Sequence, residues 1–232
     1  MKSLFVSMTR REMRMGFCLF GTGVLLAVLL RFAGIGSFSS LLLLGSLLFS
    51  GVLLIFPRFL RESAQVPFTS FGSILKMALL GLIAAQLTTL LTNDLFYFFF
   101  PKYFFYDDTG PHFISAHKEL LAAVWQQNGP VTLIFAVFLM PVVTEILHRG
   151  LIFGSLPFKS RTIACFVGTL IFAALRTCFL PGQQETAYIV ISFLQYIPMG
   201  IFFTWIYSGT ETILTPILAH ILLNAVCIFT MR

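Results

Sequence analysis

Long apolar runs separated by short polar turns constrain this chain more than any other feature of its sequence. Hydrophobic residues make up 58% of its 232 residues, charged residues make up only 10%, and the mean hydropathy is +0.93. A helix needs roughly 20 apolar residues to cross a bilayer, and backbone inside lipid must satisfy its hydrogen bonds internally. The sequence therefore predicts an all-α, polytopic transmembrane helical bundle of about seven spans, with six to eight compatible with the runs. It excludes a water-soluble domain.

The basic residues predict how this bundle is oriented. The seven runs are 16–33, 38–56, 73–100, 131–156, 163–180, 187–207 and a last one ending near Thr230, which Ser208 and Glu211 would begin as a capping box. Lys2, Arg10, Arg11 and Arg14 precede the first run, and further basic residues follow the second and the fourth. By the positive-inside rule the N-terminus is predicted to be cytoplasmic, with an uncleaved first helix. The net charge of +6 is therefore assigned to orientation and lipid headgroups, and no nucleic acid is expected as a partner.

Three regions are predicted along the chain. Residues 1–71 form an N-terminal helical pair with a cytoplasmic connection, 72–129 form the third span with an outer aromatic loop, and 130–232 form a core of four spans. In the loop, 116–127 fits a short amphipathic helix on the outer surface. This loop is the largest region available to a partner outside the cell, although a simple interfacial anchor fits it equally well.

A polar cluster interrupts the fourth run. Glu145, His148 and Arg149 lie within five positions, although each such residue costs about 2.5–3.5 kcal/mol at the centre of a membrane helix. Glu145 and Arg149 are one helical turn apart in the order that favours an ion pair. The cluster is a candidate functional site, and a buried ion pair that only fixes helix packing is the alternative.

Further polar residues lie in two later runs. His220 and Asn224 are one turn apart and share a face of the last helix. Arg176 lies near the end of its run, where it either extends to the outer headgroups or turns inward, with Glu145 as the obvious anion. Neither a metal nor another cofactor is expected, because a metal site needs three or more ligands and the only candidates, His148, His220 and Glu145, come from two helices. The four cysteines have no metal-type spacing and are interpreted as buried apolar residues (Cys18, Cys165, Cys178, Cys227).

Three stretches of this second half resemble the motifs of one family. They read Thr144-Glu-Ile-Leu-His-Arg149, Phe172-Ala-Ala-Leu-Arg176 and His220-Ile-Leu-Leu-Asn224. They are similar to the Glu-Glu-x-x-x-Arg, Phe-x-x-x-His and His-x-x-x-Asn (or Asp) motifs of the CPBP family, the CAAX-protease and bacteriocin-processing membrane proteins also called Abi proteins. The resemblance covers roughly 131–226, so 130–232 is predicted to be a CPBP-like core, in a bacterial plasma membrane.

The resemblance implies hydrolysis of a peptide bond inside the membrane. In the family, the first Glu and the second-motif His activate a water, while the third motif stabilises the oxyanion. Carried over, Glu145 and Arg149 keep the supporting ion pair, and His220 and Asn224 keep the oxyanion role. Thr144 and Arg176 depart from the pattern. A threonine hydroxyl is no carboxylate base, and an arginine cannot accept a proton near neutral pH.

The paired departures predict a pseudoprotease that holds or regulates a membrane or cell-envelope protein. In this hypothesis Arg176 joins Glu145 and Arg149 in a network that fixes helix positions. The alternative is an active endopeptidase, in peptide processing or bacteriocin self-immunity, with His148 as a substitute base. A transporter is disfavoured, because neither repeated halves nor a pair of corresponding interrupted helices is visible.

Overall fold

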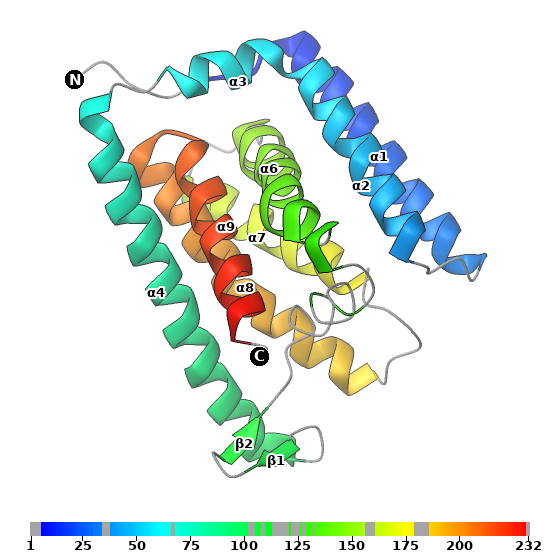
Figure 1. Cartoon of the computed structure of the whole chain (residues 1–232), viewed down its shortest axis with the longest axis vertical. Coiled ribbons are helices and arrows are strands. Elements are labelled where there is room, and N and C mark those ends of the chain that lie inside the picture. The colour runs from blue at the N-terminus through cyan, green and yellow to red at the C-terminus, as the bar shows by residue number, and fades with distance from the viewer. Residues whose placement is uncertain are drawn as a thin grey trace.

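The computed structural model describes residues 6–33, 38–65, 68–101, 105–107, 110–112, 121, 126, 129–131, 133–155, 161–178 and 186–230. Its helices are α1 (Arg10–Phe32), α2 (Phe38–Ile55), α3 (Pro57–Ala64), α4 (Phe68–Phe99), α6 (Met140–Glu145), α7 (Arg161–Cys178), α8 (Thr186–Thr210) and α9 (Leu214–Phe229) (Figure 1). Two π-helical segments, η2 (Leu133–Leu139) and η3 (Ile146–Phe153), flank α6. The predicted all-α transmembrane bundle is confirmed.

The seven predicted spans are helical over their described residues, and most ends lie within three residues of those expected. The exceptions are α1 and α4, which begin earlier, at Arg10 and Phe68, and α9, which begins later, at Leu214. Within the described ranges, four helices are long and apolar enough to cross a membrane, and α2 with α3 would be a fifth if this bent pair is one span. The helices of the predicted fifth and seventh spans are apolar but shorter, over Thr162–Thr177 and Leu214–Phe229. The chain is therefore an integral membrane protein whose helices differ in the depth that they can cross.

The connection after the second span is itself a helix. α2 and α3 meet at an angle of 78°, and Pro57, which has no N–H to lose, begins α3. Figure 1 shows α3 running across one end of the molecule, from the end of α2 to the start of α4. Its Arg58 donates to the Ser7 carbonyl at 2.7 Å and pairs with Glu12 at 3.1 Å, so α3 is tied to the start of α1.

The capping box occurs at a different place from the one predicted. Ser208 lies inside α8, and Glu211, with a φ of 55°, follows the end of that helix, so the predicted pair does not begin α9. Thr9 and Glu12 make a reciprocal pair instead, in which the Thr9 N–H donates to the Glu12 carboxylate at 2.6 Å and the Glu12 N–H donates to the Thr9 hydroxyl at 3.1 Å. This box begins α1 and holds Glu12 beside Arg58.

A short hairpin follows α4. Strands β1 (Phe105–Asp107) and β2 (Gly110–His112) pair antiparallel, with Asp107 opposite Gly110. Both strands lie in the region predicted to be the outer aromatic loop, where no strand was predicted. The predicted surface helix over 116–127 falls almost wholly outside the described residues.

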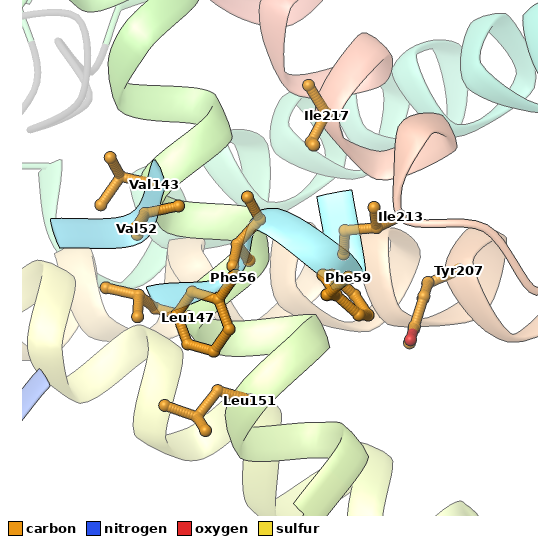
Figure 2. Close-up of a cluster of buried hydrophobic side chains, with 10 residues drawn as sticks. Val52, Phe56, Phe59, Val143, Leu147, Leu151, Tyr207, Ile213 and Ile217 are labelled. Carbon is orange, nitrogen blue, oxygen red and sulfur yellow. The ribbon is translucent and has the colours of Figure 1, made fainter. Parts of the chain in front are cut away.

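An apolar cluster ties the N-terminal helices to the segment that carries the polar cluster. Figure 2 shows its side chains converging from α2, α3, α6, η3, α9 and the end of α8 (Val52, Phe56, Phe59, Val143, Ile146, Leu147, Leu151, Tyr207, Ile213, Ile217). Phe56 and Phe59 are almost completely buried in it. Large apolar groups removed from water or lipid on all sides fix helix positions through packing. The α6–η3 segment is therefore held from several sides.

Close helix packing in this region depends on a glycine. A Cβ at Gly45 of α2 would lie 3.0 Å from the Met140 sulfur and closer still to the Phe135 ring. We expect Gly45→Ala to lower the free energy of unfolding by about 1–3 kcal/mol, because an overpacked ring must shift. Gly21→Ala, which meets nothing within 4 Å, is the matched control and should cause no loss. Unfolding of both variants by increasing SDS in mild detergent, followed by circular dichroism, measures the difference.

Candidate functional site

Charged and polar side chains meet between helices that are far apart in the sequence. Glu145 comes from α6, Arg149 from η3, Arg176 from α7 and His220 from α9. These elements pack together with α8 in the second half of the chain (Figure 1). Glu145 and His220 are completely buried, Arg149 is 1% exposed, and Arg176 is half-buried.

The predicted ion pair between Glu145 and Arg149 is confirmed. Arg149 Nη1 lies 3.2 Å from Glu145 Oε2, and Nη2 of the same guanidinium donates to the Gly200 carbonyl at 3.2 Å. The guanidinium carbon also lies 4.5 Å from the centre of the Phe172 ring. A buried arginine thus has a carboxylate, a carbonyl and an aromatic face around it, which is what a cation removed from solvent requires.

His220 links this pair to Arg176. Its Nδ1 lies 2.7 Å from Glu145 Oε1, and its Nε2 lies 3.3 Å from Arg176 Nη2. A guanidinium only donates, so Nε2 accepts and carries no proton. Nδ1–H then donates to the carboxylate, and His220 is neutral. Hydrogen bonds therefore run in one direction, from Arg176 through His220 to Glu145.

Arg176 turns inward instead of extending to the headgroups. Glu145 was the anion expected for an inward-facing Arg176, and among the described residues the guanidinium is linked to it by hydrogen bonds through His220. It also lies 5.5 Å from the centre of the Phe172 ring. The network predicted from Glu145, Arg149 and Arg176 therefore exists with His220 as its connecting member.

His148 lies next to the network but is not part of it. Its Nδ1 is 2.8 Å from the carbonyl oxygen of the buried Thr144, so Nδ1 carries the proton and Nε2 holds a lone pair. This Nε2 is buried and has no hydrogen-bond partner among the described residues. The imidazole lies between the rings of Phe20 and Phe172, with centroid distances of 6.0 and 5.3 Å.

Asn224 makes a contact with the backbone of the fourth span. Its Nδ2 donates to the Ala136 carbonyl at 2.8 Å, in π-helical η2. π-helical turns are rare and are frequently found at functional sites. Asn224 shares a helix face with His220 as predicted, but this N–H is already used. The oxyanion role implied for the two residues stays a prediction.

Two contributors were missed from the sequence. Phe172, quoted only as a motif position, contacts Arg149, His148 and Arg176. Gly200 supplies a carbonyl to Arg149, and its place inside an apolar helix gave no hint of this. The described residues contain no group of three His, Cys, Asp or Glu side chains that could hold a metal ion.

Gly200 also allows α8 to approach α7 closely. A Cβ there would lie 2.9 Å from Thr169 Cγ2 and 3.4 Å from Thr169 Cα. We expect Gly200→Ala to push the helices apart, weaken the bond from Arg149 and lower the free energy of unfolding by about 1–3 kcal/mol. The control is Gly72→Ala in α4, because a Cβ at Gly72 would meet no atom within 4 Å. Equal SDS unfolding midpoints for the two variants would contradict this account of the α7–α8 contact.

The fold and this site define a class, namely polytopic helical membrane proteins that bury a charged network between their last helices. Comparison with family models narrows the class: residues 126–226 match the family described as "Type II CAAX prenyl endopeptidase Rce1-like". This match supports the relationship to the CPBP family that the three motifs indicated, and it covers the part of the chain that carries them. No curated protein and no solved structure matches the chain.

Proposed function

We propose that the protein is a catalytically degenerate CPBP-type membrane protein, which binds and regulates another membrane or cell-envelope protein without cleaving it. One observation carries the proposal. At the two positions where the family motifs have the water-activating Glu and His, this chain has Thr144 and Arg176. Neither side chain can take a proton from water near neutral pH.

The contacts around the site support the same conclusion. Glu145 receives the His220 proton donor on one oxygen and lies 3.2 Å from Arg149 on the other. His220 Nε2 accepts from Arg176. Glu145 Oε1 and His220 Nε2 therefore already have internal donors, and a water at either atom would have to displace one of them. Glu145 Oε2 is buried beside the positive charge of Arg149 and has no hydrogen-bond partner among the described residues.

A second candidate function rests on His148. Its buried Nε2 lone pair has no partner within the described part of the chain and could accept a proton, as a general base must. This would make the protein an active intramembrane endopeptidase with a rearranged site. The apolar rings of Phe20 and Phe172 beside the imidazole count against an ordered water there.

One purification from the native host decides between the two candidates. The wild type and His148→Ala are isolated in mild detergent, and co-purifying proteins and new peptide termini are identified by mass spectrometry. A regulator retains one intact membrane or envelope protein at fixed stoichiometry in both preparations. New termini that disappear in His148→Ala would overturn the proposal and establish the protease.

The proposal also places the protein in a bacterial plasma membrane with its N-terminus in the cytoplasm. Arg10, Arg11 and Arg14 are exposed at the start of α1, and Arg61 is exposed on α3, so one end of the molecule carries several basic residues. Basic residues next to spans favour the cytoplasmic side. A reporter that is active only outside the plasma membrane, fused to the N-terminus, should stay inactive. An active reporter would reverse the orientation.

A further inference from the structure

The polar network contains more positive than negative charge. Two guanidinium groups, Arg149 and Arg176, accompany one carboxylate, Glu145, and the hydrogen bonds of His220 make it neutral. Contacts with Phe172 offset part of this charge, but a ring has no net charge of its own. An unbalanced cation inside a membrane bundle is costly, so the site favours an additional anion.

The excess charge lies on Arg176. Arg149 has the Glu145 carboxylate and the Gly200 carbonyl as partners. A guanidinium has five N–H donors, and within the described ranges Arg176 uses them only toward His220. Arg176 is only half-buried, whereas Arg149 is almost fully enclosed. An incoming group can therefore reach Arg176.

The depth of this guanidinium indicates where the anion comes from. Arg176 is near the end of α7, yet its guanidinium contacts His220, a fully buried residue in the middle part of α9. Lipid phosphates lie at the interface, whereas a side chain on a transmembrane segment can be carried to this depth. A carboxylate fits best, because it pairs with a guanidinium through two parallel hydrogen bonds.

We propose that Arg176 is a recognition site for a carboxylate carried by an Asp or Glu inside an apolar transmembrane segment of the partner protein. The inference rests on the proposed function and names the chemistry of its partner. An acidic residue within the partner's span selects that partner, since an otherwise identical neutral span leaves Arg176 unbalanced.

The test uses the full chain in phosphatidylcholine nanodiscs and two synthetic apolar helices of about 20 residues. The helices differ only in a central Glu or Gln, and binding is measured by fluorescence energy transfer. We expect the Glu helix to bind wild type about tenfold more tightly than the Gln helix, as one charge-assisted contact provides. Arg176→Gln should abolish the difference, Arg176→Lys should keep part of it, and Lys76→Gln, at an exposed cation on α4, should keep all of it.

Three outcomes overturn this inference. Equal binding of the two helices to wild type removes the carboxylate preference. A second outcome is that added phosphatidylglycerol abolishes the preference for the Glu helix, and that wild type retains this lipid while Arg176→Gln does not. This outcome assigns the site to a lipid phosphate. A preference that survives in a folded Arg176→Gln places the site elsewhere. Cleavage of either helix, seen by mass spectrometry of the same samples, would instead overturn the proposed function.

Discussion

Glu145→Gln is expected to lower the free energy of unfolding by about 3–5 kcal/mol, the largest loss that we expect from a single substitution in this chain. The carboxylate is completely buried and is the one anion that the described network contains. Without it, Arg149 and Arg176 face each other's charge with no compensation, while His220 loses the acceptor of its Nδ1–H. SDS-induced unfolding in mild detergent measures the loss.

The matched control is Glu62→Gln, which removes an i,i+4 partner of the same kind from α3. Glu62 lies 2.8 Å from Arg58, closer than Glu145 to Arg149, but these two side chains are 41% and 42% exposed. Solvent screens such a pair, so its loss should cost less than about 1 kcal/mol. Equal losses for the two variants would contradict the view that burial determines the contribution of Glu145.

Sequence spacing predicted the part of this network that lies within one helical segment. Glu145 and Arg149 are four residues apart on one stretch of helix, so their spacing alone predicts the pair that the structure shows. Most helix ends were also predictable, because a bilayer requires long apolar runs and polar residues end them, but the start of α9 was not. The site could be located in the sequence because charged side chains inside membrane helices cost free energy and are therefore rare there.

Contacts between distant helices were not predictable in this way. The bond between His220 and Glu145 joins residues 75 positions apart, and it depends on how α9 packs against α6. For the same reason Arg176 was assigned to Glu145 and lies against His220 instead. The π-helical turns on either side of α6 were also not predicted, since nothing in the sequence of the fourth span distinguishes π-helical from α-helical turns. The true capping box was overlooked because Thr9 precedes a basic, weakly apolar turn.

Thr144→Glu combined with Arg176→His is expected to turn the protein into a peptidase. The double variant restores the family motifs at both departing positions, within the stretch 126–226 that matches the family model. The first substitution supplies a carboxylate next to Glu145, and the second replaces a fixed cation by a group that can share a proton. General acid–base catalysis contributes about 10²–10⁴-fold, so cleavage of quenched fluorogenic apolar peptides in proteoliposomes should rise by that order over wild type.

The two single variants separate chemistry from charge. Thr144→Glu alone supplies a carboxylate but leaves Arg176 where the family motif has a His, so it should remain inactive. Arg176→His alone removes the excess charge but supplies no carboxylate base, so it should also remain inactive. Activity only in the double variant would mean that the scaffold still admits water and peptide, and that the two departures alone abolished catalysis. Cleavage by wild type at the rate of the double variant, lost in His148→Ala, would show instead that His148 had taken over the role of the base.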